Sequence, residues 1–215
     1  PSIEEVRRRA IDAHAVQNRA VTAQDYSAIV YRMPPRFGAL KRVSVVQDTD
    51  SIKRNLNMYV VSENDNGTLA KTNRTIKENV KFWINQYKMI NDTIDILDAR
   101  IVNIGVDFNI KASPDFNKFE VLESARQSIV EYFSDYHLEI GEPLYISNLY
   151  NVIKRSIGVD DVIKVNIKQQ SGDDYSDAAF DTKQNTSADG RILYVPEDMI
   201  LEVKFLDVDI RGTVK

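Results

Sequence analysis

The chain has no cysteine and only two histidines, His14 and His137. Without cysteine it can form no disulfide, no thiolate metal site and no thiolate nucleophile. Each histidine lies in or beside a predicted helix and lacks a second histidine four residues away, so zinc binding and Ser-His-Asp hydrolysis have little support. The sequence therefore predicts neither a metal centre nor a cofactor.

Glycine-rich loops and long apolar runs are also missing. The eight glycines form neither a G-x-x-x-x-G-K-[ST] nor a G-x-G-x-x-G motif, so we expect no phosphate-binding loop. No apolar run approaches the roughly 20 residues that cross a bilayer, and we expect no membrane insertion. A net charge of −4 attracts nucleic-acid phosphates little, so we expect no nucleic-acid partner.

What the chain does have is a globular composition. Of its 215 residues, 43% are hydrophobic and 28% are charged, which suits one large domain or two small ones. Helical and strand patterns predict an α+β fold, with mixed small sheets packed with amphipathic helices, in two subdomains over residues 1–98 and 99–215. The chain begins with Pro1 rather than Met, and we expect it to be an excised or processed piece of something longer.

The first subdomain is predicted to combine helices with a small sheet. The expected elements are a first helix with Glu4 and Glu5 in its first turn, a helix over 22–32 capped by Thr22 with Asp25 at its third position, strands over 41–47 and 57–62, and a helix over 73–90. Pro34 and Pro35 should stop the second helix. The pattern Thr75-x-x-Glu78 predicts a capping box at the start of the third.

The helix predicted over residues 73–90 has two apolar faces. Its inward stripe recurs at steps of four and three residues, at Ile76, Val80, Trp83, Tyr87 and Ile90. Phe82 and Met89 are seven residues apart and fall on nearly the opposite side, where a helix covering a monomer core meets water. We interpret Phe82 and Met89 as candidate contacts to a partner subunit.

The second subdomain is predicted to be a strand-helix-helix-strand unit followed by a final strand. The expected elements are a strand over 101–111, a helix from Ser113-Pro114 to about residue 136, a short helix to 157 capped by Ser147 and closed by Gly158, a strand with Ile163, Val165 and Ile167 inward, and a strand over 200–205. The first strand should bury Val102, Ile104, Val106, Phe108 and Ile110. The long helix should bury Phe119, Leu122, Ala125, Ile129, Val130 and Phe133.

Residues 169–190 form a long polar excursion before the final strand. A loop of this length in a compact domain is usually functional or disordered. Tyr175 and Phe180 are candidate anchors for a partner that would order it. The acidic part, residues 172–181, offers an alternative function as a metal-assisted or carboxylate-based hydrolase. It lacks the ligand spacing of an EF-hand loop, and no catalytic residue is identified in it, so a non-enzymatic role is favoured.

Several segments resemble, in their order and spacing, the baseplate J-like family. They are R-A-V-T-A-Q-D-Y at residues 19–26, the proline-led strand that follows, K-M-I-N-D at 88–92, the alternating strand over 101–111 and S-I-G-V-D-D-V at 156–162. Within that family the chain looks most like the C-terminal part of the large baseplate wedge subunits of T-even-type contractile-tailed phages. The likeness covers residues 18–165, and none of its segments is a catalytic signature.

The resemblance implies a structural protein of a tail baseplate rather than an enzyme. Wedge subunits of this kind look like elongated α+β modules. They self-associate, as homodimers or through ring contacts, and bind other wedge proteins to build the inner ring around the tail hub. The ring rearranges when the sheath contracts. The resemblance therefore implies a place in the virion, after assembly in the host cytoplasm. A baseplate-like part of a bacterial contractile secretion machine is the other setting that these segments fit.

Overall fold

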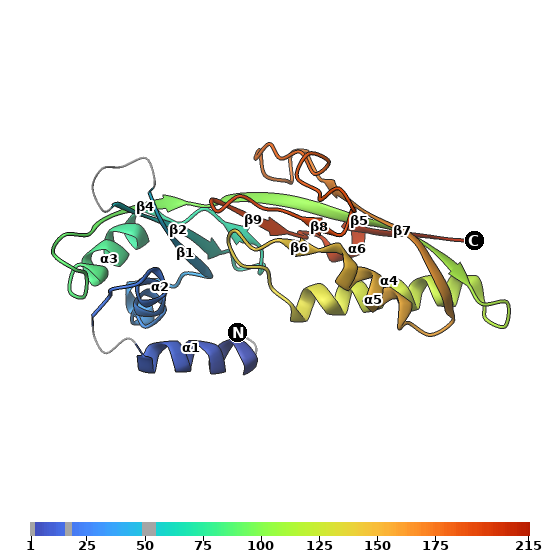
Figure 1. Cartoon of the computed structure of the whole chain (residues 1–215), viewed down its shortest axis with the longest axis horizontal. Coiled ribbons are helices and arrows are strands. Elements are labelled where there is room, and N and C mark those ends of the chain that lie inside the picture. Colours follow the sequence, from blue (N-terminus) through green and yellow to red (C-terminus); the bar gives the residue numbers. More distant parts are fainter. Residues whose placement is uncertain (1–2, 16–18, 49–54) are drawn as a thin grey trace. The chain divides into compact units, whose positions relative to one another are not determined.

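The computed structural model describes residues 3–15, 19–48 and 55–215. The chain forms two compact units, unit 1 from Pro1 to Arg100 and unit 2 from Ile101 to Lys215. Each unit combines helices with small sheets (Figure 1), so the predicted α+β class is confirmed.

Unit 1 is built around strand β2. Its elements are α1 (Ile3–Ala15), α2 (Ala23–Tyr31), the 3-10 turn η1 (Pro35–Phe37), β1 (Arg42–Gln47), β2 (Asn55–Glu63), β3 (Leu69–Ala70), α3 (Arg74–Ile84) and β4 (Thr93–Asp98). β1 runs antiparallel and β4 parallel to β2, and β3 pairs antiparallel with the end of β2. Buried side chains of α2 and α3 form one apolar core with those of the sheet.

Helix α2 begins as the sequence predicts. The Thr22 hydroxyl accepts a hydrogen bond from the Asp25 N–H at 3.2 Å, and the Asp25 carboxylate accepts one from the Thr22 N–H at 2.8 Å. The predicted capping box is therefore formed. The helix ends at Tyr31, just before Pro34, because the residue preceding a proline is disfavoured in the helical region.

Helix α3 begins differently from the prediction for residues 73–90. The Asn73 side chain accepts a hydrogen bond from the Thr75 N–H at 3.1 Å and caps the helix. Thr75 is thus inside the first turn, and the predicted capping box with Glu78 was wrong. Asparagine is among the best N-cap residues, so the helix is capped by Asn73, two residues before Thr75.

Helix α3 also ends early, at Ile84. The Ile84 carbonyl accepts hydrogen bonds from the Tyr87 and Lys88 N–H groups at 2.9 and 3.0 Å, and the chain then turns toward strand β4. The apolar stripe ends in this turn with Tyr87, which packs against the core as predicted. Ile90, predicted to be buried, is 98% exposed.

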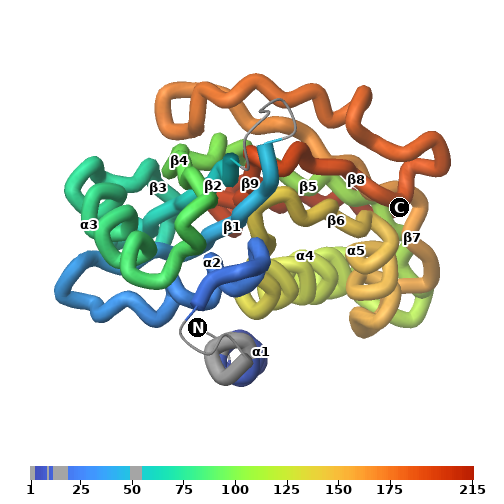
Figure 2. Tube along the Cα trace, turned by 60° about the vertical axis from the view of Figure 1, so that its left-hand side comes forward, coloured from blue at the N-terminus to red at the C-terminus, as the bar shows by residue number. Residues whose placement is uncertain are grey.

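Unit 2 is organised by the 13-residue strand β5. Its elements are β5 (Arg100–Ala112), α4 (Lys118–Asp135), β6 (Leu144–Tyr145), α5 (Ile146–Lys154), β7 (Val159–Gln169), β8 (Ile192–Leu193), β9 (Met199–Glu202), α6 (Leu206–Asp209) and β10 (Ile210–Val214). β5 pairs antiparallel with β7, parallel with β10, and also with β9, while β6 and β8 form a separate antiparallel pair. Helices α4 and α5 lie side by side against this sheet (Figure 2), and their inner faces share its core.

Strand β5 follows the predicted alternation. Its inward residues are each at most 3% exposed: Val102, Ile104, Val106, Phe108 and Ile110. The other face is packed with polar groups near its start, where the Asn103 amide donates to Glu202 at 2.8 Å. The Asn103 side-chain oxygen also accepts a hydrogen bond from the Ser176 N–H at 2.7 Å.

Strand β7 departs from the predicted alternation at Ile163. This residue was expected to point inward, yet it is 47% exposed, whereas Val162 is buried. A β-bulge is the reason. Asn109 of β5 pairs with Lys164, but the next residue, Ile110, pairs with Val162, so Ile163 is skipped in the ladder.

Helix α4 begins at Lys118 rather than at Ser113-Pro114. The Asn117 side chain accepts a hydrogen bond from the Phe119 N–H at 3.0 Å and fixes this start. Phe119 is consequently turned to solvent and is 80% exposed, so its predicted burial was wrong. Val121, which the stripe did not include, is buried instead.

The remaining elements of unit 2 contain two further differences. Helix α5 begins at Ile146, so Ser147 lies inside the helix and does not cap it. Gly158 has a φ of +83°, the left-handed conformation expected after the helix. The final strand predicted over 200–205 ends at Glu202, and the short helix α6 separates it from β10, which returns alongside β5.

Candidate interaction surfaces

Phe82 lies on the outer side of α3 and is 69% exposed. Met89 lies in the turn after the helix and is half-buried, and its N–H donates a hydrogen bond to the Tyr26 hydroxyl at 3.3 Å. The prediction that the two residues share one helix face was therefore wrong. The turn exposes Ile90 instead, so the most exposed apolar side chains of this region are Phe82 and Ile90.

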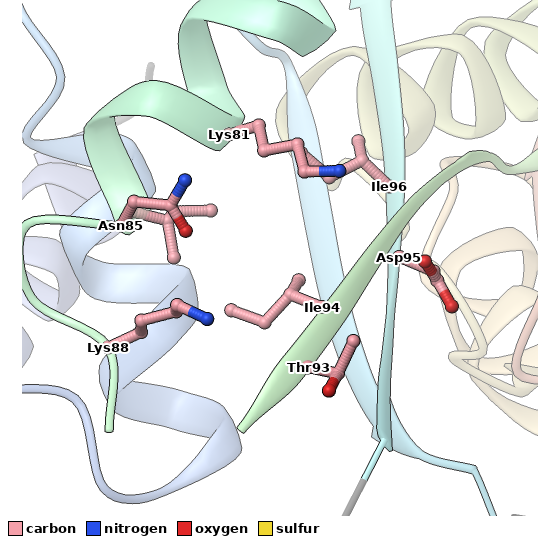
Figure 3. Close-up of a pocket in the computed structure, with 8 residues that line it drawn as sticks. Lys81, Asn85, Lys88, Thr93, Ile94, Asp95 and Ile96 are labelled. Carbon is pink, nitrogen blue, oxygen red and sulfur yellow. The ribbon is translucent and has the colours of Figure 1, made fainter. Parts of the chain in front are cut away.

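A shallow pocket lies between the end of α3 and strand β4 (Figure 3). It has a volume of about 100 Å³ and is lined by Lys81, Ile84, Asn85, Lys88, Thr93, Ile94, Asp95 and Ile96. Figure 3 shows the side chains of Lys81 and Lys88 extending toward β4, with the Asp95 carboxylate directed away from both. The pocket thus combines buried isoleucines with two ammonium groups.

The lysines around this pocket differ in their contacts. Lys77, one turn earlier on α3, forms an ion pair with Asp98 at 2.6 Å. Lys88 donates a hydrogen bond to the backbone oxygen of Asp92 at 3.0 Å. Lys81 is exposed and has no ion-pair partner among the described residues. Its ammonium group is therefore available to a partner.

Helix α1 turns apolar side chains outward. Glu5 faces the rest of unit 1, where its carboxylate lies 2.9 Å from the Arg42 guanidinium, and these side chains are only 8% and 3% exposed. At 100° per residue, Ile3 and Val6 fall on the other side of the helix. They are 82% and 51% exposed, so this face also resembles one that a partner covers.

Three exposed apolar side chains gather at the start of α4, and we call them the apolar tip: Phe116, Phe119 and Ile157. They are 48%, 80% and 72% exposed. A Cβ added at Gly158, the residue after Ile157, would come within 3.0 Å of the Phe116 ring, so the two turns are in contact. The sequence interpretation missed this surface because it placed Phe119 well inside the helix, whereas Asn117 caps α4 and leaves Phe119 in the first turn.

Tyr175 and Phe180 were predicted to contact a partner, but both are used within unit 2. Phe180 is 7% exposed and belongs to the core. The Tyr175 hydroxyl donates a hydrogen bond to Asp209 at 2.7 Å, and its ring packs edge-on against Phe205 with centroids 5.6 Å apart. This hydrogen bond raises the pKa of Tyr175 to about 12. The two aromatics therefore anchor the polar excursion to its own unit.

Acidic residues also occur as neighbours in the sequence, and Asp160 and Asp161 are one such pair. Asp160 forms an ion pair with Lys111 at 2.7 Å, and that hydrogen bond lowers the pKa of Asp160. Asp161 lies 3.4 Å from the ammonium of Lys154. Among the described residues, no group of three or more histidine or carboxylate side chains is placed to hold a metal ion. The acidic segment 172–181 is among those residues, so the hydrolase alternative gains no support.

The histidines and the helices add no further site. His137 is exposed just after α4, and the side chain of His14 lies outside the described part of the chain. Within that described part, no helix has the length and apolar character needed to span a membrane.

The comparison with known proteins rests on the fold. No protein-family model and no curated protein matches the sequence. The α+β architecture is, however, similar to that of a solved baseplate protein, a chain in the cryo-EM structure of the anti-feeding prophage baseplate, 6-fold symmetrised. The similarity covers 94% of this chain with a TM-score of 0.53 and 12% sequence identity. This chain spans only 41% of the length of that baseplate chain.

Proposed function

We propose that this chain is a non-enzymatic structural protein of a contractile-tail baseplate. The observation that carries the proposal is the similarity in fold to a chain of the anti-feeding prophage baseplate, which extends over 94% of this chain. The sequence segments that resemble the baseplate J-like family support the same conclusion, because they were identified without reference to the fold.

Exposed apolar side chains on both units support a role in assembly. Unit 1 exposes Phe82 and Ile90, and unit 2 exposes the apolar tip. Clusters of exposed apolar side chains occur at protein–protein interfaces. Burying each one fully contributes about 1.5–3 kcal/mol. Each unit therefore has an apolar surface that a partner would bury in an assembly.

Within a baseplate we assign the chain to the wedge. It associates with copies of itself, as a homodimer or through ring contacts, and binds other wedge proteins to form the inner ring. Assembly takes place in the host cytoplasm, the product lies in the virion tail, and the contacts rearrange when the sheath contracts. Identical subunits that repeat one contact around an axis form such a closed ring.

The apolar tip provides the test. Phe116→Asp with Phe119→Asp introduces two charges at exposed positions, so the fold should persist and the circular dichroism spectrum should be unchanged. We expect the variant to lose co-sedimentation with partner copies or wedge proteins. Val208→Asp is the matched control, since Val208 is an exposed apolar residue of α6 that is 52% exposed and lies outside the tip. A tip variant that assembles like the control would contradict the proposal.

A further inference from the structure

The two units of the chain carry opposite net charges. Unit 1 contains 16 lysines and arginines and 12 aspartates and glutamates, a net charge of +4. Unit 2 contains 12 basic and 20 acidic residues, a net charge of −8. The whole-chain charge of −4 conceals this asymmetry. Opposite charges on two units of one chain favour contact between the basic unit of one copy and the acidic unit of the next.

The pocket beside α3 is the part of unit 1 best suited to an acidic partner. Lys81 and Lys88 extend across it, and Lys81 has no ion-pair partner among the described residues (Figure 3). The one carboxylate in its lining, that of Asp95, accepts a hydrogen bond from the Asn55 amide at 3.3 Å and is directed away from the lysines. The isoleucines of the lining, Ile84, Ile94 and Ile96, supply its apolar part. An occupant therefore needs carboxylates beside apolar groups.

The polar excursion of unit 2 has this chemistry. Asp173, Asp174 and Asp177 are exposed, and none has an ion-pair partner in the described part of the chain. Tyr175 and Phe180 hold the same segment against unit 2, through the hydrogen bond to Asp209 and burial in the core. Carboxylates on an anchored segment lose less conformational entropy on binding than carboxylates on a free loop.

We propose that the pocket beside α3 is the docking site for the acidic excursion of a second copy of this chain. The inference rests on the self-association proposed above and adds its polarity. Unit 1 of one copy contacts unit 2 of another. The contact is reciprocal in a two-fold dimer, or it runs head to tail and closes into a ring where the rotation between copies allows. The fixed charges supply the orientation, because pocket against pocket and excursion against excursion are repulsive.

Charge reversal tests the two surfaces separately. Lys81→Glu with Lys88→Glu, and Asp173→Lys with Asp174→Lys, should each weaken self-association of the full chain at least about tenfold, measured by sedimentation equilibrium at low ionic strength. Lys81→Glu alone reports on the pocket if the double variant unfolds.

The matched control places the same change in charge elsewhere on unit 1. Arg36 and Lys71 are exposed and lie outside the pocket. Arg36→Glu with Lys71→Glu should therefore change the association constant by less than about fivefold, as expected of isolated surface charges.

Mixing the two reversed variants tests the polarity. The lysine-reversed copy keeps its acidic excursion, and the aspartate-reversed copy keeps its basic pocket. Each variant alone should associate weakly. An equimolar mixture should recover at least about half of the mass increase of the unmodified chain, because the acidic excursion of one variant can bind the basic pocket of the other. Reversed variants that associate normally, or a mixture whose mass does not rise, would overturn the contact between pocket and excursion and leave self-association standing. An unmodified chain that never associates would overturn both.

Discussion

The phenol of Tyr26 donates a hydrogen bond of 2.6 Å to the carboxylate of Asp92, and both residues are buried. Tyr26 ends the segment R-A-V-T-A-Q-D-Y, and Asp92 ends the segment K-M-I-N-D. The N–H of Ala20, in the first segment, also donates to the Tyr87 carbonyl, just before the second, at 3.0 Å. Two segments that carry the family resemblance thus hold unit 1 together.

Tyr26→Phe removes this hydrogen bond and leaves the Asp92 carboxylate buried without the phenol. We expect the free energy of unfolding of unit 1 to fall by about 1.5–3 kcal/mol, the usual contribution of a hydrogen bond to a charged group. Urea unfolding can be followed by the fluorescence of Trp83, the single tryptophan, whose indole N–H donates to the Ile29 carbonyl at 2.8 Å. Tyr194→Phe, at a position 55% exposed in unit 2, is the control. Equal midpoints for the two variants would contradict the assignment.

Arg42→Met removes the guanidinium that lies 2.9 Å from Glu5 in a nearly solvent-free contact. Breaking a buried ion pair from one side costs about 3–5 kcal/mol, so α1 should detach from unit 1. Hydrogen exchange should then show loss of amide protection in α1 with little change in α3. Glu5→Met with Arg42→Met removes both charges and should restore protection, since apolar replacement of a buried pair is often neutral. Identical exchange in the single and double variants would exclude this role.

Phe82→Asp and Met89→Asp should act differently, although the sequence placed both residues on one surface. Phe82 is 69% exposed, so we expect its variant to keep its thermal midpoint and to associate less. Met89 is half-buried, and its variant should lose about 1–3 kcal/mol of stability. Differential scanning fluorimetry and light scattering on the same samples separate the two effects. An unfolded Phe82→Asp variant would assign that ring to the monomer core.

The alkaline stability of unit 2 should depend on Tyr175. The hydrogen bond to Asp209 raises the pKa of Tyr175 to about 12, from an ordinary value of 10.0. The folded state thus favours the protonated phenol, so this contribution is complete below about pH 10 and is lost as the pH rises toward 12. Unfolding midpoints measured across that interval should fall less steeply for Tyr175→Phe than for the unmodified chain. Parallel pH profiles would show that the phenol makes no such contribution.

The sequence predicted features that depend on local chemistry or simple periodicity. The capping box of Thr22 and Asp25 and the inward face of β5 are examples, because neighbouring residues alone decide them. Errors arose where a contact distant in sequence decides the outcome. Met89 is drawn into the turn after α3 by a hydrogen bond to Tyr26, and Ile163 is turned outward by a bulge against β5.

The candidate surfaces were harder to predict than the fold. An exposed aromatic residue and a core aromatic residue look alike in the sequence. Phe119 was assigned to the core because the helix was expected to begin near Ser113, whereas Asn117 caps it and leaves Phe119 in the first turn. Phe180 was assigned to a partner because its loop is polar, yet it packs into the core of unit 2.

The most direct measurement of the central claim is the solution mass of the unmodified chain across a concentration series at low ionic strength. A protein that acts by assembly should show a weight-average mass that rises with concentration from the 24.6 kDa of one copy. Added salt should shift that rise to higher concentration, because screening weakens contacts between charged units. A mass that stays at 24.6 kDa at every concentration and salt level would contradict the account.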